Sequence, residues 1–208
     1  AVLHVDGPLL ILAGAGSGKT RVLTNRIAYL IQEKGVYPSS ILAITFTNKA
    51  AREMKERIDN LVGNVSDNIW VSTFHSMCVR ILRRDIEKID YDRSFVIFDY
   101  TDQQTVVKDC LKELNLNEKN YAPKSVLEMI GRAKDELIAP DTFSKIYAAD
   151  FRMSRIAKIY ELYQKKLKQN NALDFDDIIM LTIKLFSTHP EVLDYYQRKF
   201  RYILVDEY

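Results

Sequence analysis

Short runs of apolar residues recur along this chain and alternate with longer stretches whose apolar positions lie three or four residues apart. The short runs lack the strict alternation of a half-exposed strand, which indicates strands covered on both faces, as in a parallel sheet. We expect four such strands, at residues 9–13, 41–46, 69–74 and 202–207. Amphipathic helices are expected at 19–34 and 48–62, the second with Asn48 as its N-cap. The alternation of strands and helices predicts an α/β fold.

The stretch from about residue 93 to 172 has a different pattern. After a short apolar piece at 95–98 it is helical in periodicity and almost free of glycine, with the clearest helices at 102–114, 124–137 and 155–169. The simplest interpretation is an all-helical insertion into an α/β core that resumes before the last strand. The predicted division is therefore 1–92 for the first part of the core, 93–172 for the insertion and 173–208 for the return to the core.

Composition narrows the class of protein only slightly. The 208 residues carry a formal net charge of +2, which is too small to indicate nucleic-acid binding by itself. No apolar run approaches the roughly 18 residues of a membrane span, and the two cysteines are too few for a disulfide framework. We therefore expect a cytoplasmic protein with no membrane partner. The chain starts without methionine and stops directly after an acidic pair, so we expect a fragment of a longer protein.

The segment AGAGSGKT, residues 13–20, lies between a predicted strand and a predicted helix, where a phosphate-binding loop is found. Its glycines allow successive backbone N–H groups to point at phosphate oxygens, and the helix dipole adds positive potential. Lys19 supplies a charge for the β- and γ-phosphates, and Thr20 offers a hydroxyl to Mg²⁺. The general pattern has glycine where this chain has Ala13. The segment predicts a nucleotide site made of Ala13, Gly14, Ala15, Gly16, Ser17, Gly18, Lys19 and Thr20.

The last predicted strand ends in Asp206 and Glu207, the position of the second half of such a site. Asp206 can hold Mg²⁺, and Glu207 can take a proton from the attacking water. An acidic pair could instead be a solvated strand end, but its occurrence together with the phosphate loop favours nucleotide hydrolysis.

A phosphate loop is shared by kinases, GTPases, transporters and motors, so other segments must decide the function. Ala51 stands where a guanine-binding motif needs aspartate, which disfavours a GTPase. Two predicted strands end in similar polar and aromatic residues, which could follow a single strand of nucleic acid. The alternative, equally weighted on chemistry alone, is a pair of capped helices with Phe46 and Phe74 in the core. The candidate DNA-binding residues are Thr45, Phe46, Asn48, Thr73, Phe74 and His75.

The segments AGAGSGKTR, TFTNKAA, STFHSM, LDFDDII and ILVDEY, in this order and spacing, resemble the UvrD/PcrA/Rep family of superfamily 1 DNA helicases, the PcrA branch most closely. The resemblance covers essentially the whole chain. It implies a RecA-like ATPase domain, called 1A, interrupted by a helical domain, called 1B. It also implies ATP and Mg²⁺ as cofactors and translocation along single-stranded DNA in the 3′ to 5′ direction, with unwinding of duplex DNA ahead.

The resemblance further implies roles for single residues. Lys19, Thr20, Asp206 and Glu207 take the phosphate, metal and water-activating positions, Arg21 lies against adenine, and Arg57 lies near the nucleotide. The second RecA-like domain, with its arginine finger and half of the DNA track, is expected in a missing C-terminal half. A repair, a replication and a plasmid role stay open. A small-molecule P-loop kinase and a non-catalytic DNA-binding scaffold are the alternatives.

Two further segments have a plain structural interpretation. The segment LDFDDII could hold a metal through its three carboxylates, but Asp174 as a helix N-cap followed by acidic first-turn residues explains it better. Tyr160 and Tyr163 are expected to be packing residues.

Overall fold

The computed structural model describes residues 1–14, 16–63 and 67–206, and it divides into two compact units. The first unit comprises residues 1–77 and 190–208, and the second comprises 78–189. These boundaries differ from the predicted ones at 92/93 and 172/173. Residues 78–92 and 173–189, on either side of the predicted insertion, group with it in the second unit.

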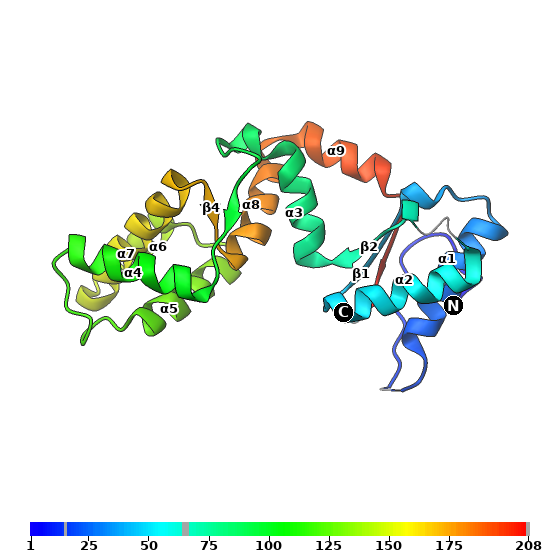
Figure 1. Cartoon of the computed structure of the whole chain (residues 1–208), viewed down its shortest axis with the longest axis horizontal. Helices are drawn as coiled ribbons and strands as arrows, with labels where there is room; N and C mark the ends of the chain where they lie inside the picture. Colours follow the sequence, from blue (N-terminus) through cyan, green and yellow to red (C-terminus); the bar gives the residue numbers. More distant parts are fainter. Residues whose placement is uncertain (15, 64–66, 207–208) are drawn as a thin grey trace. The chain divides into compact units, whose positions relative to one another are not determined.

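A parallel sheet forms the centre of the first unit. It has three strands in the order β2-β1-β5, and Figure 1 shows β1 and β2 side by side. In register, Thr45 pairs with Thr73 and Ile44 with Val205, so all three strands end at the same edge. Every residue of β1 is buried, as a central strand requires. The strand bounds are β1 Ile41–Thr45, β2 Trp70–Thr73 and β5 Tyr202–Val205.

The predicted strand at 9–13 is wrong: these residues have no regular secondary structure. Leu10 and Leu12 are largely exposed, at 69% and 88%. A run of apolar residues becomes a strand only when a neighbouring strand accepts its backbone hydrogen bonds, and no described strand pairs with this run.

Two helices pack beside the sheet and against each other. They are α1 Lys19–Gln32 and α2 Asn48–Val62, both close to their predicted ranges. The predicted N-cap of α2 is one residue off, because the side chain of Thr47, not Asn48, accepts the hydrogen bond from the Ala50 N–H. Their apolar faces and the sheet share one buried core, which includes Ile27, Leu30, Ile41, Ala43, Met54 and Ile58.

The remaining described elements of the first unit are a short 3-10 helix η1 Pro38–Ser40 and helix α9 Pro190–Lys199. Trp70 of β2 packs edge-on against Phe200, with ring centroids 4.9 Å apart, and its face carries the Lys199 ammonium at 4.5 Å. Helix α3 Phe74–Asp85 begins directly after β2, and the boundary between the units falls within it.

The second unit is mostly helical, as expected, and has a core of its own. Tyr160 and Tyr163 are buried in that core, which confirms their predicted packing role. The described elements of this unit after α3 are η3 Ile86–Ile89, β3 Val96–Ile97, α4 Tyr100–Glu113, α5 Pro123–Asp135, α6 Pro140–Ile146, α7 Phe151–Gln169, β4 Ala172–Leu173 and α8 Phe175–Thr188.

The expectation of an all-helical insertion is wrong in one detail. Strands β3 and β4 form a short parallel ladder, in which Val96 pairs with Ala172 and Ile97 with Leu173. The ladder joins the two ends of the predicted insertion, which lie far apart in the sequence. Two-residue strands carry too little periodicity to be recognised from sequence. Within the described ranges no helix is long and apolar enough to cross a membrane.

Candidate nucleotide and nucleic-acid site

The phosphate loop closes on itself before α1 begins. The Ser17 hydroxyl donates to the Gly14 carbonyl oxygen at 2.6 Å, and the backbone of Gly16 and Gly18 has φ of +73° and +88°. Residues with a Cβ rarely adopt these left-handed angles, so glycine is required at both positions. Gly18 is the N-cap of α1 and provides no side-chain cap, so the first N–H groups of the helix remain available to an anion. Ala15 lies outside the described residues.

The structure brings the loop and the acidic strand end together. The Thr20 hydroxyl donates a 2.8 Å hydrogen bond to Oδ2 of Asp206, although 186 residues separate the two in sequence. Asp206 is 8% exposed, and its backbone N–H donates to the Ile44 carbonyl oxygen, which extends the β1–β5 ladder. The Lys19 ammonium donates to the Ala13 carbonyl oxygen at 3.2 Å. Thr20 and Asp206 thus bring two hard oxygen donors together, which fits Mg²⁺, and Lys19 is the residue next to Thr20 in the loop, where it can meet a phosphate.

A cavity of about 770 Å³ adjoins this point and follows α1. This volume is within the usual range for small-molecule sites. The loop residues Gly16, Ser17 and Gly18 line one part of it, and Arg21 lines it one turn further along α1. Arg57 does not line this cavity; it projects from α2, where it pairs with Glu53 at 3.7 Å.

The two polar and aromatic strand ends are neighbours in space. Phe46 follows β1 and is 60% exposed, and its ring lies edge-on to that of Phe74, with centroids 5.8 Å apart. Phe46 is therefore not a core residue, which counts against the alternative of two buried phenylalanines. Phe74 is half-buried, so Phe46 is the exposed ring of this pair, and an exposed ring at the carboxyl edge of a parallel sheet is suited to contact the bases of a single strand.

The other candidate DNA-binding residues have more local roles. Thr73 is buried, and its hydroxyl oxygen accepts a 3.2 Å hydrogen bond from the Ser76 N–H at the start of α3. Thr45 is buried at the end of β1, whereas Asn48 is exposed in the first turn of α2. Burial lowers the pKa of His75, so this side chain favours the neutral form. Both strand ends thus combine a buried threonine with exposed groups at the same edge.

The segment LDFDDII forms a helix start, as predicted. Asp174 is the N-cap of α8 and forms a capping box with Asp177. Both carboxylates are buried, and each accepts a hydrogen bond from the Lys134 ammonium, at 2.6 and 2.8 Å. Tyr163 donates a third hydrogen bond, to Asp174. We call Lys134, Tyr163, Asp174 and Asp177 the buried charge cluster.

The ionisable groups of the buried charge cluster differ in the direction in which their pKa values are shifted. Burial opposes the charge on Lys134, but the two carboxylates outweigh this effect and raise the pKa of Lys134. Burial raises the pKa of Asp177, whereas Lys134 holds the pKa of Asp174 below its usual value despite burial. Burial, together with the Asp174 carboxylate, raises the pKa of the adjacent Asp176 to about 6. The cluster is explained by packing and capping, without a metal.

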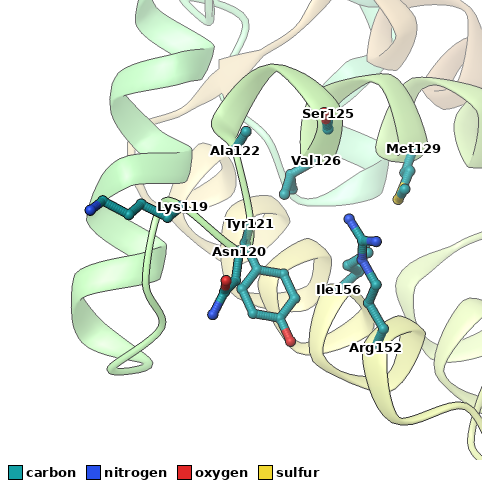
Figure 2. A pocket seen from close by; sticks show the side chains of 9 residues that line it. All are labelled: Lys119, Asn120, Tyr121, Ala122, Ser125, Val126, Met129, Arg152 and Ile156. Carbon is teal, nitrogen blue, oxygen red and sulfur yellow. The ribbon is translucent and has the colours of Figure 1, made fainter.

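The second unit has a smaller cavity of about 190 Å³. Figure 2 shows the Tyr121 ring and the Arg152 side chain facing it, while the Lys119 side chain extends away. None of the predicted site residues lines it. The candidate site therefore remains at the carboxyl edge of the sheet in the first unit.

The residues that extend the cavity beyond Arg21 were not predicted from the sequence. Asn25 and Tyr29 line it on the next turns of α1. The spacing of Arg21, Asn25 and Tyr29 at successive intervals of four residues was a signal in the sequence, but an amphipathic helix gives no indication of which groove its polar side faces. Glu207 was predicted as the water-activating residue and lies outside the described residues.

Comparison with known proteins agrees with this geometry. The whole chain, residues 1–208, matches the family described as UvrD/REP helicase N-terminal domain. It is 61% identical over its full length to a protein of Bacillus subtilis, 58% to one of Staphylococcus aureus and 57% to one of Staphylococcus epidermidis. Each of these relatives is named ATP-dependent DNA helicase PcrA, and the chain spans 28% of its length. On this match the chain belongs to the UvrD/REP helicase N-terminal domain family.

Proposed function

We propose that this chain is the N-terminal part of a cytoplasmic ATP-dependent DNA helicase that moves along single-stranded DNA in the 3′ to 5′ direction. The observation that carries the proposal is the hydrogen bond between Thr20 and Asp206, which joins the phosphate loop to the acidic strand end. The names of the relatives support the same activity. A role in DNA repair or replication is part of the proposal, since duplex DNA with a single-stranded region is the substrate that such a motor would meet there.

The residues of the loop perform the binding step. The free N–H groups at the start of α1 and the Lys19 ammonium bind the β- and γ-phosphates, and Lys19 leaves the Ala13 carbonyl oxygen to do so. Thr20 and Asp206 would hold Mg²⁺, which neutralises charge on the phosphates when bound. We assign Glu207 as the base that accepts a proton from the attacking water.

The carboxyl edge of the sheet would bind the second substrate, single-stranded DNA. Phe46 and Phe74 would stack on bases, while hydroxyl and amide groups at the same strand ends would contact phosphates. Strand β1 pairs with β2 on one side and with β5, which precedes Asp206, on the other, so the nucleotide site and the DNA track would share one sheet. A movement of the phosphate loop can therefore alter the affinity for DNA.

We assign efficient ATP hydrolysis and DNA unwinding to this chain only in combination with the rest of the protein. A second RecA-like domain would supply an arginine finger, a group that contributes roughly 10³–10⁵ in rate in related phosphate-transfer sites. We therefore expect negligible ATP hydrolysis and no unwinding by the 208-residue chain alone. A P-loop kinase is disfavoured because it has no use for an exposed Phe46, and a non-catalytic scaffold is disfavoured by the intact Thr20–Asp206 pair.

The test is ATP hydrolysis by the full-length protein with and without single-stranded DNA, compared with its Lys19→Ala variant. We expect strong stimulation by DNA in the wild type and loss of hydrolysis in Lys19→Ala. Lys124→Ala, which removes an exposed lysine of α5, is the matched control and should behave as the wild type. Hydrolysis that is indifferent to DNA would contradict the helicase assignment and favour the kinase.

A further inference from the structure

One carboxylate beside the buried charge cluster is left without a counter-ion. Asp176 is half-buried in the first turn of α8 and has no hydrogen-bond or ion-pair partner among the described residues. Lys134, the cation of the cluster, already donates to both Asp174 and Asp177. We propose that Asp176 makes the contact between α5 and α8 sensitive to pH: the contact tightens when Asp176 takes up a proton and loosens when it is ionised. This inference does not depend on the proposed function.

The Asp176 carboxylate lies directly against the backbone of α5. A Cβ atom at Gly131 would be 3.3 Å from Oδ2 of Asp176, which is tighter than ordinary van der Waals contact. The absence of a side chain at Gly131 thus leaves room for this carboxylate where α5 and α8 contact each other. A change in the charge of Asp176 therefore acts on the contact between the two helices.

The charges that act on Asp176 are predominantly negative. They comprise three carboxylates and one ammonium, and they belong to Asp174 and Asp177 of α8 and to Asp135 and Lys134 of α5. From α7, Tyr160 and Tyr163 add only neutral hydroxyls, because burial raises the pKa of both. Helix η3 also contacts α8 and carries Lys88 and Glu87, of which Glu87 pairs with Arg93 at 2.7 Å. A proton on Asp176 removes one of the like charges that repel each other here.

The folded state holds the proton of Asp176 more tightly than an unfolded chain does. Burial raises the pKa of Asp176 to about 6, and the Asp174 carboxylate adds to this effect. An aspartate in an unfolded chain has a pKa of about 3.9. Between these two values the folded state binds more protons, so the stabilisation is complete below about pH 4 and is lost as the pH rises through about 6.

The test is amide hydrogen exchange of the full-length protein over a series from about pH 5 to about pH 8. Protection factors, which correct for the intrinsic effect of pH on exchange, are compared in α5 and at the start of α8 for the wild type, Asp176→Asn and Asp141→Asn. Asp141 is the matched control, because it is exposed and is the second residue of α6, as Asp176 is of α8.

We expect protection in the wild type to be roughly 3- to 30-fold higher at the acidic end of the series. The difference between the two pKa values sets a limit of about 100-fold, and the partial exposure of Asp176 reduces it. Asp141→Asn should respond to pH as the wild type does. Asp176→Asn carries no charge at any of these pH values, so its protection in α5 and α8 should not change with pH.

Gly131→Ala supplies a second readout should Asp176→Asn fail to fold. The added Cβ excludes water from one side of the carboxylate, so the pH at which protection changes should move upward from about 6. A purely structural effect of the alanine would alter protection without moving this pH. The proposal is overturned if Asp176→Asn keeps the pH dependence of the wild type, if the wild type has none, or if the midpoint in Gly131→Ala is unchanged or lower.

Discussion

Under the proposed function, the exposed Phe46 ring is the single residue that most favours DNA over a small phosphate acceptor as the second substrate. Its apolar surface at the sheet edge is 60% exposed and contacts Phe74 edge to face. Exposed aromatic rings of this kind can stack on the bases of a single strand, which is the role that we propose for Phe46.

We expect Phe46→Ala to weaken binding of single-stranded DNA without affecting nucleotide binding. Stacking of one base on an aromatic side chain contributes about 1–3 kcal/mol, which corresponds to roughly a 5- to 150-fold loss of affinity. Fluorescence anisotropy of a labelled oligothymidine with the full-length protein measures this loss. Tyr37→Ala removes an aromatic ring that is 80% exposed and does not lie at a strand end, so it should bind DNA as the wild type does. If Phe46→Ala binds single-stranded DNA with unchanged affinity, Phe46 has no role in DNA binding.

The sequence points to single residues of the candidate nucleotide site where the expected chemistry is tied to a fixed spacing, and their roles in binding stay a prediction. Lys19, Thr20 and Asp206 were all identified in the sequence, and the structure joins two of them by a hydrogen bond. Asn25 was not identified, because an asparagine on a helix has many uses and its neighbours are defined only in the folded state. The N-cap of α2 was misplaced for a related reason, since adjacent Thr47 and Asn48 can both cap a helix.

At the scale of elements, the start of α8 depends on charges held inside the protein. Asp174 and Asp177 cap this helix, and Lys134 of α5 lies between their carboxylates with its side chain fully buried. The network also includes Tyr163 of α7 through its hydroxyl. Three helices are therefore joined by one buried group of hydrogen bonds.

Lys134→Met should destabilise the second unit strongly. The variant leaves two carboxylates buried without a cation, and removal of one partner of a buried ion pair costs about 3–5 kcal/mol. Urea unfolding followed by circular dichroism measures the change in the free energy of unfolding. Lys158→Met, an exposed lysine of α7, is the control and should have little effect. A Lys134→Met variant as stable as the wild type would show that the carboxylates obtain protons or water at no cost.

Elements were predicted well where hydrophobic periodicity was long and poorly where it was short. Helices α1, α2, α4, α5 and α7 follow amphipathic patterns of many residues, and each was anticipated within a few residues. Residues 9–13 have the composition of a buried strand but lie exposed without a pairing strand. The ladder of β3 and β4 was missed because its pairing joins segments about 75 residues apart.

At the scale of the whole molecule, the chain forms two units, each with its own buried core. The nucleotide cavity and the aromatic strand ends belong to the first unit, and the buried charge cluster belongs to the second. Binding to a folded unit stabilises that unit by mass action. A ligand bound in the cavity should therefore stabilise the first unit, whereas a substitution in the buried charge cluster should destabilise the second.

Amide hydrogen exchange can reveal this separation. We expect Mg²⁺–ATP to slow exchange in the first unit of the full-length protein, most strongly in the phosphate loop and α1. Lys134→Met should accelerate exchange in α5, α7 and α8 while the response of α1 to ATP persists. Equal acceleration throughout residues 1–208 would indicate that the two units unfold as one.

The α/β class of the fold and the chemistry expected of the phosphate loop follow from the order of residues alone. Both depend on local order along the chain: the period of apolar residues sets helices and strands, and the loop needs glycines, lysine and threonine at fixed spacing. The tertiary structure is needed to establish which distant groups meet. It brought Asp206 to Thr20, exposed Phe46 beside Phe74, enclosed Lys134 between two carboxylates and turned Asn25 toward the cavity. Contacts between residues far apart in sequence follow from how elements pack, and packing depends on the whole set of buried surfaces at once.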